Sequence, residues 1–474
     1  MPYQCLAILL SLLLAVQPVA GLASTRPDLT LTQALGKSYE ELFDLAPGLG
    51  FTQSHIDAHR KHLERARDTC IDEYKDAAKS YNRQLRDAQA ELRRRTARLN
   101  DEERHELHCR IQNLRKMEQQ AELLANHAIP TAFDNKLAKL ELVEKWPAEL
   151  RKIEAEIAAE KHYERRYGDV RDIGLRNIRS GQQDDIKRGH EAVQQMKMMG
   201  MMPPEMDNPA VVQYVNDLSQ KIAAASDLQV PLQVTILNSK EINAFALPGG
   251  YIFIQRGLLE AAETEAQLAG VIAHEIAHMT GRHGHRLMRR ATIAGILYQA
   301  AQIAALIFTG GVAGIGTYYA LQYGFYGLGL VLSLDLLGVS RDFEREADQL
   351  GVQYAWNAGI DPRGFTEFFS LMASRFGYVA GLSWFRTHPP FYDRMVESQR
   401  EMMFLPPKDS LVRTTTAFEE MKRALEDVTK KAEADEKQRP SLLSPVEDCP
   451  EPDLPRYKPG DPIENLCPAI LEAP

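Results

Sequence analysis

The pattern of apolar and charged positions divides the chain into segments of different character. From residue 51 to residue 168, charges of both signs interleave with Ala, Leu and Gln, which favour helices. Asn100-Asp101 marks a turn within this segment. We therefore predict a long charged helical hairpin or coiled coil over 51–168. Two interpretations of it stay open: an arm that handles partners or substrates, and a solvated spacer.

A different pattern follows the charged segment. Two β-like runs, 232–237 and 251–255, flank a turn-rich stretch at 243–250. Residues 257–280 are apolar on nearly every side, which predicts a buried helix. Short strands among helices predict an α+β domain that is predominantly α, and we expect this domain to span 185–425.

Four further segments complete the predicted organisation. Residues 1–23 contain an apolar run of signal-peptide length followed by small residues, so we expect export, and 24–50 form a lead segment. Residues 291–338 are apolar and rich in glycine. They could span a membrane twice, lie on its surface or form buried helices, and these alternatives stay open. Residues 426–474 are rich in proline and are expected to form an extended tail.

Composition narrows the function classes. The formal net charge is −9, which argues against a nucleic-acid-binding protein because neutralising phosphates requires a basic face. Five cysteines are too few for a disulfide scaffold in 474 residues. Cys449 and Cys467 flank a proline-rich loop, so we expect a disulfide between them, while the pairing of Cys70 and Cys109 stays open.

The chemistry concentrates in His274-Glu275-Ile276-Ala277-His278, inside the predicted buried helix. Residues four apart share a helix face, so both imidazoles can bind one metal ion. Glu275 projects about 100° around the helix axis from His274. There it can take a proton from a water molecule and return it to the leaving amine. This spacing is a zinc-peptidase pattern and suits one Zn²⁺ per chain. The structural alternative is a pair of hydrogen-bonded helix histidines.

A second acidic segment supplies a carboxylate for the same ion. Glu344 and Asp348 are four residues apart and share a helix face. Glu344 is predicted to be the third metal ligand. Asp348 is predicted to accept the spare N–H of one ligand histidine, which fixes the histidine tautomer. Glu346 points away from this face and is expected at the surface.

A last candidate segment runs from His388 to Arg394. His388 could stabilise the oxyanion of the tetrahedral intermediate, or occupy the open metal position in a resting state, and both roles stay open. Arg394 is expected to contact the residues that hold the metal, without binding the metal itself. His283 and His285 follow the first motif beyond the predicted helix end, and no role is assigned to them.

In their order and spacing these motifs resemble the zinc metallopeptidases of the HtpX and CAAX-prenyl-protease type. The resemblance covers roughly residues 185–425, about half of the chain. It is strongest to the exported, periplasmic branch linked to outer-membrane protein assembly and quality control. It implies a zincin-type domain in which a small edge-stranded sheet packs on the active-site helices. We expect no tetratricopeptide array like that of well-known periplasmic relatives within these residues, and the charged helical region is not part of the family pattern.

The resemblance also implies roles for individual residues. It implies that His274, His278 and Glu344 hold the zinc ion. Glu275 corresponds to the general base of the family, and His388 to a histidine that lies at the metal. An extended substrate could add to the edge of the small sheet and pass over the zinc.

The sequence therefore predicts an enzyme, a zinc metalloendopeptidase that hydrolyses peptide bonds of misfolded or unassembled envelope proteins. Its partners would be polypeptide substrates, among them outer-membrane proteins, and 291–338 could contact a membrane surface. We expect an exported, periplasmic location and no nucleic-acid partner. The alternative is a chaperone-like scaffold whose helical arm binds clients while the protease is latent.

Overall fold

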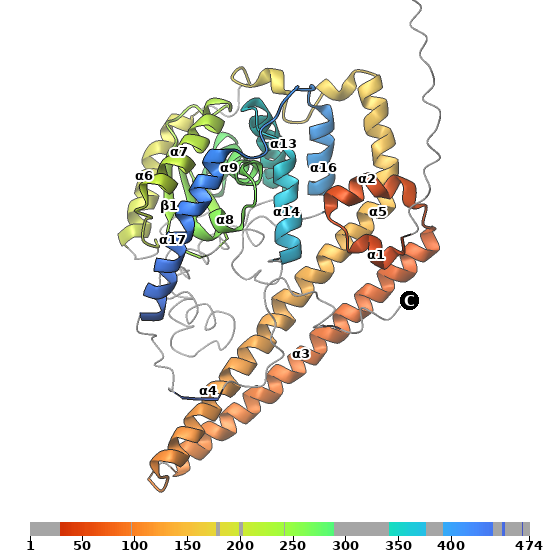
Figure 1. Ribbon diagram of the computed structural model, residues 1–474. Helices are drawn as coiled ribbons and strands as arrows, with labels where there is room; N and C mark the ends of the chain where they lie inside the picture. The colour runs from red at the N-terminus through yellow and green to blue at the C-terminus, as the bar shows by residue number, and fades with distance from the viewer. Residues whose placement is uncertain are drawn as a thin grey trace, which may run out of the picture.

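The computed structural model describes residues 29–95, 97–176, 181–198, 202–240, 242–288, 341–375, 392–438, 448–450 and 467. The expected signal peptide (1–23), the apolar insert (291–338), His388 and most of the expected tail lie outside these residues. Helices dominate the described residues and surround one small sheet (Figure 1). The predicted α+β, predominantly α fold class is confirmed.

Long helices form an arm that projects from the rest of the molecule (Figure 1). They are α3 (Gln53–Arg95), α4 (Asp101–Leu123), the π-helical turn η1 (Leu124–Ala128) and α5 (Ile129–Ala158). Asn100 caps α4: its Oδ1 accepts from the Glu103 backbone N–H at 2.8 Å, and Glu103 Oε2 accepts from the Asn100 N–H at 3.0 Å. The predicted helical hairpin and its turn at Asn100-Asp101 are confirmed.

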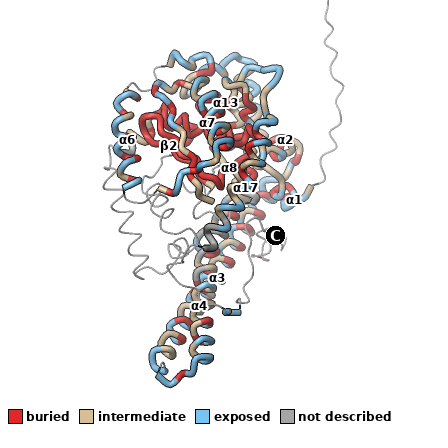
Figure 2. Tube along the Cα trace, turned by 60° about the vertical axis from the view of Figure 1, so that its left-hand side comes forward, coloured by how far each residue is buried: buried red, intermediate tan, exposed pale blue. Residues whose placement is uncertain are grey.

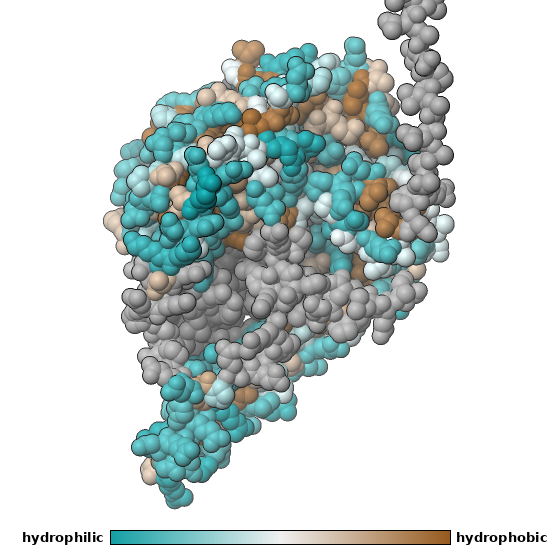
Figure 3. Space-filling view, viewed as in Figure 1, coloured by the Kyte–Doolittle hydropathy of each residue, from teal (hydrophilic) through white to brown (hydrophobic). Residues whose placement is uncertain are grey.

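The outer part of the arm has little core. A small apolar cluster joins α3 and α4, including Leu85, Leu99 and Leu114. Figures 2 and 3 show that the tip of this hairpin is largely exposed and mostly hydrophilic. Both interpretations of the arm, a partner-binding element and a spacer, remain predictions.

The base of the arm packs against the N-terminal helices α1 (Leu31–Leu35) and α2 (Tyr39–Leu49). Trp146 of α5 is buried, donates its indole N–H to the Phe43 carbonyl at 2.9 Å, and meets the Phe43 ring edge-on at 4.7 Å. The Tyr39 backbone N–H donates to Ser370 Oγ at 3.3 Å. The described part of the lead segment therefore attaches the arm to α14 (Arg363–Arg375).

The small sheet contains three strands, β1 (Gln233–Leu237), β2 (Ala244–Leu247) and β3 (Tyr251–Gln255). Their spatial order is β1-β3-β2, with β1 parallel and β2 antiparallel to β3. The β-like runs at 232–237 and 251–255 are confirmed. The stretch 243–250 was expected to be a turn, yet it contains β2, because Phe245 pairs with Phe253 and stacks on its ring at 4.9 Å.

Helices enclose this sheet and form the main core. They are α6 (Gln182–Met198), α7 (Pro209–Ala224), α8 (Arg256–Ala261), α9 (Glu265–Thr280), α10 (His283–Met288), α13 (Arg341–Asn357), α14 (Arg363–Arg375), α16 (Tyr392–Phe404) and α17 (Thr416–Gln438). Every residue of α9 is buried, as the apolar pattern of 257–280 predicted, and α13 and α14 pack against it. Figure 2 shows this buried centre in red. Residues 426–438 are helical, so the expected start of the extended tail at residue 426 is wrong.

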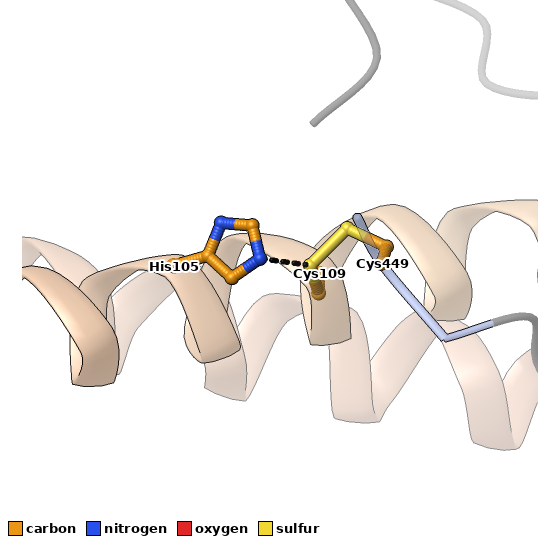
Figure 4. A group of neighbouring side chains, drawn as sticks. All are labelled: His105, Cys109 and Cys449. Carbon is orange, nitrogen blue, oxygen red and sulfur yellow. Dashed lines mark hydrogen bonds between the residues drawn. A yellow bond between two sulfur atoms is a disulfide. The ribbon is translucent and has the colours of Figure 1, made fainter. Parts of the chain in front are cut away.

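Two disulfides connect the arm to the C-terminal residues. Cys70 of α3 bonds to Cys467, with Cα atoms 5.9 Å apart, and Cys109 of α4 bonds to Cys449, with Cα atoms 5.2 Å apart. Figure 4 shows the second disulfide beside His105. The expected Cys449–Cys467 bridge is wrong, because each of these cysteines lies against a different arm helix rather than against the other.

Candidate metal centre

The two histidines of the motif meet on one face of α9. His274 and His278 are one helical turn apart, and their Nε2 atoms lie 2.9 Å from each other. Both side chains are buried. The i, i+4 spacing thus directs two imidazole nitrogens at a single point, as helix geometry requires.

Helix α13 brings Glu344 to the same point. Its Oε2 lies 3.5 Å from His274 Nε2, and its Oε1 lies 3.3 Å from His278 Nε2. The two helices approach closely because Gly351 has no side chain: a Cβ there would lie 3.0 Å from the His274 Cα. Two imidazole nitrogens and a carboxylate at these separations form a donor set that suits Zn²⁺. Three protein ligands are one fewer than a tetrahedral zinc ion takes, as in catalytic zinc sites.

The carboxylate of Asp348 lies behind His274. Its Oδ1 is 3.0 Å from His274 Nδ1, the nitrogen that faces away from the metal position. Arg394 of α16 donates to both oxygens of Asp348 at 2.7 and 2.6 Å and lies 3.0 Å from Glu344 Oε2. An Asp348 that accepts the Nδ1–H of His274 leaves the Nε2 lone pair for a metal ion.

Charge and burial shift the pKa values of these groups. Burial raises the pKa of Asp348, but the charge of Arg394 and its hydrogen bonds outweigh burial and lower this pKa below its usual value. Burial also opposes a charge on His274, but hydrogen bonds to Asp348 and Glu344 outweigh it and raise the His274 pKa to about 9. The metal-free site therefore attracts a positive charge, which a divalent cation would supply in place of the proton.

Glu275 is buried on α9 directly beside His274. Burial lowers the pKa of Arg394, but Asp348 and Glu344 raise it above its usual value, and Glu275 contributes to that rise. The structure therefore brings His274, Glu275, His278, Glu344, Asp348 and Arg394 into one buried cluster. His388 lies outside the described residues.

Two further residues lie against this cluster, and the sequence pattern does not identify them as part of the site. His283 received no role, yet its Nδ1 lies 2.7 Å from His278 Nδ1. Glu346 was expected at the surface, which is wrong: it is 7% exposed and lies 3.1 Å from His283 Nε2. Burial lowers the pKa of His283 to about 4. Two features of the sequence could have indicated this pair: a histidine five residues after His278, and an acidic residue between Glu344 and Asp348.

The apolar insert predicted to contact a membrane also lies outside the described residues. None of the helices that the structure describes is long and apolar enough to cross a lipid bilayer.

Comparison with known proteins identifies the region that carries the site. A candidate beta-barrel assembly-enhancing protease of Vibrio cholerae serotype O1 is 31% identical over 221 residues, 45% of this chain and 43% of the relative. The beta-barrel assembly-enhancing protease of Escherichia coli K12 is 28% identical over 182 residues, 37% of this chain and 35% of the relative. The mitochondrial metalloendopeptidase OMA1 of Schizosaccharomyces pombe is 29% identical over 179 residues, 37% of this chain and 48% of the relative.

This chain spans less than half the length of each of these curated relatives. The model of peptidase family M48 matches residues 209–401. That range includes both histidines of α9, Glu275 and the acidic face of α13. The match confirms the metallopeptidase resemblance inferred from the motifs: residues 209–401 are similar to peptidase family M48.

Proposed function

We propose that this domain is a zinc metalloendopeptidase with one Zn²⁺ held by His274, His278 and Glu344. The observation that carries the proposal is the convergence of these three ligand groups within 3.5 Å of each other, beside the buried Glu275. Zn²⁺, when bound, supplies a Lewis acid that lowers the pKa of a water molecule to about 7.

The protein groups around the metal position each have a role in this proposal. Glu275 takes the proton of the attacking water and delivers it to the leaving amine of the cleaved peptide bond. Asp348 holds the tautomer of His274, and Arg394 balances the charge of Asp348 and Glu344. On the family resemblance His388 lies at the metal, where oxyanion stabilisation and resting-state occupation of the open position are the two roles to test.

The edge of the sheet suggests how a substrate binds. β2 pairs with β3 on one side, and within the described residues no strand pairs with its other side. β2 also packs against α9, the helix that carries the two histidines. An extended polypeptide that adds to β2 by main-chain hydrogen bonds would therefore lie along the metal-binding helix.

The names of the relatives support a substrate class. Two of them are named for beta-barrel assembly, and their similarity to this chain extends over 221 and 182 residues. We propose misfolded or unassembled envelope proteins, among them outer-membrane proteins, as substrates, and an exported, periplasmic location. Contact of 291–338 with a membrane surface belongs to the same proposal.

Metal analysis combined with a digest tests the proposal. Purified protein should contain one Zn²⁺ per chain and degrade unfolded casein. A chelator should stop the degradation, and added Zn²⁺ should restore it. Zinc-loaded protein that prevents aggregation of unfolded clients but never cleaves them would instead support the chaperone-like scaffold.

A further inference from the structure

The chain folds back sharply after the metal-binding helix and returns a histidine to it. α9 ends at Thr280, and Arg282 adopts a left-handed conformation with φ of 52°. Gly281 leaves room for the returning ring, since a Cβ there would lie 2.4 Å from His283 Nε2. Asp185 of α6 holds the turn by accepting two hydrogen bonds from Arg282, at 2.6 and 2.8 Å.

The turn places His283 between His278 and Glu346. His283 Nδ1 lies 2.7 Å from His278 Nδ1, and His283 Nε2 lies 3.1 Å from Glu346 Oε2. The ring stacks on Phe343 with centroids 4.5 Å apart and planes 5° from parallel. Arg286 lies over the same Phe343 ring, 3.9 Å from its centroid, and 3.5 Å from Glu346. His283 is 1% exposed, so its ring has little freedom to rotate.

Hydrogen-bond directions in this group are mutually consistent. His278 Nε2 faces Glu344 and His274, which leaves Nδ1 to carry the proton when Nε2 binds a metal ion. The His278 Nδ1–H then donates to His283 Nδ1. The opposite nitrogen, His283 Nε2–H, donates to the carboxylate of Glu346. With these assignments, each ring N–H that His278 and His283 direct along the relay faces an acceptor.

We infer that His283 and Glu346 are positioning residues for metal binding, which orient His278 through a histidine–histidine–carboxylate relay. The inference rests on the metal site of the proposed function. The two ligand histidines are then held differently: Asp348 contacts His274 directly, whereas Glu346 acts on His278 through His283. Helix α13 provides a proposed ligand, Glu344, and both of these carboxylates.

Zinc affinity of the purified full chain, measured by competition with a chromophoric chelator, tests the relay directly. His283→Phe keeps the ring volume and the stacking on Phe343 but has no nitrogen to accept from His278. We expect it to bind Zn²⁺ about 10- to 100-fold more weakly than wild type. His283→Gln can accept with its oxygen and donate with its amide, so it should recover most of the affinity. His59→Phe, which replaces a buried histidine of α3, is the matched control and should keep wild-type affinity.

A double-mutant cycle separates a relay from two independent effects. Glu346→Leu should weaken Zn²⁺ binding in wild type and add nothing in the His283→Phe background, because Glu346 acts through His283. The visible spectrum of Co²⁺-substituted protein should change in His283→Phe, and thermal unfolding of the metal-free variants should show that they are folded. Wild-type affinity in His283→Phe, or an equal effect of Glu346→Leu in both backgrounds, would overturn the relay. A wild-type chain that binds no Zn²⁺ would overturn the proposed function instead.

Discussion

The guanidinium of Arg394 lies 3.0 Å from the Oε2 of Glu344, a proposed metal ligand. The same guanidinium holds Asp348 with two hydrogen bonds, and all three side chains are about 2% exposed or less. One cation on α16 therefore balances two buried carboxylates on α13. A bound metal ion would share this task, because it neutralises Glu344 directly.

Replacing Arg394 with methionine should destabilise the metal-free protein by about 3–5 kcal/mol, since it leaves buried carboxylates without their cation. Zn²⁺ should restore part of the loss by neutralising Glu344. Urea unfolding with and without Zn²⁺ measures both effects. Arg345→Met is the matched control on α13, where the partly exposed pair with Asp393 should contribute at most about 1 kcal/mol. Equal effects of the two substitutions would contradict the argument.

Glu275→Gln should separate metal binding from chemistry. The amide keeps the shape of the side chain but cannot accept and return a proton, so casein hydrolysis should fall by at least about 100-fold. Zn²⁺ content should stay at one per chain. Glu420→Gln, an exposed position on α17, should retain both properties. Turnover near the wild-type rate in Glu275→Gln would rule out the assigned base.

Local rules were sufficient for the main elements of the site. Helix periodicity alone places His274 and His278 on one face of their helix, and Glu344 and Asp348 on one face of a second helix. The hairpin turn follows from Asn100-Asp101, whose capping geometry the structure shows. The motif order then indicated the metallopeptidase resemblance, which the similarity of residues 209–401 to peptidase family M48 confirms. These features depend on residues close together in the sequence, which is why a pattern could reveal them.

Other features depend on where distant segments meet. β2 is only four residues long and lies in a turn-rich stretch, so its strand character appears only when β3 pairs with it. Glu346 contacts His283, which a left-handed turn at Arg282 returns to α9. The partner of Cys449 depends on where it lies relative to α4. Neither periodicity nor spacing carries this information.

The two disulfides should be detectable and should stabilise the arm. Peptide mapping without reduction should find Cys70 joined to Cys467 and Cys109 joined to Cys449. Cys109→Ser should lower the free energy of unfolding by about 2–4 kcal/mol, because the unfolded chain gains freedom. Added reductant should remove the difference between this variant and wild type. A Cys449–Cys467 peptide in the map would contradict the structure.

A buried polar network connects the region after the arm to the metal-binding helix. Arg165 pairs with Glu401 of α16, and Gln353 of α13 donates to the same carboxylate at 2.7 Å. Farther along, Tyr354 donates to Asp227 at 2.8 Å and lies 3.1 Å from the hydroxyl of Thr280, the last residue of α9. Because Glu401 is buried in this network, its protonation changes a charge inside the core rather than at the surface.

Burial raises the pKa of Glu401 from 4.5 to about 7, although Arg165 and Gln353 oppose the rise. A raised pKa means that the folded chain keeps a proton that the unfolded chain has already released. This contribution to stability is complete below pH 4.5 and is lost as the pH rises through 7, and it amounts to about 3 kcal/mol at 1.36 kcal/mol per pKa unit. The side chain of Glu401→Gln does not titrate. As the pH rises from 4.5 to 7.5, the unfolding free energy of this variant minus that of wild type should therefore increase by about 3 kcal/mol. Urea unfolding of both proteins across this range measures the difference. A difference that does not change with pH would show that Glu401 is ionised in the folded protein throughout.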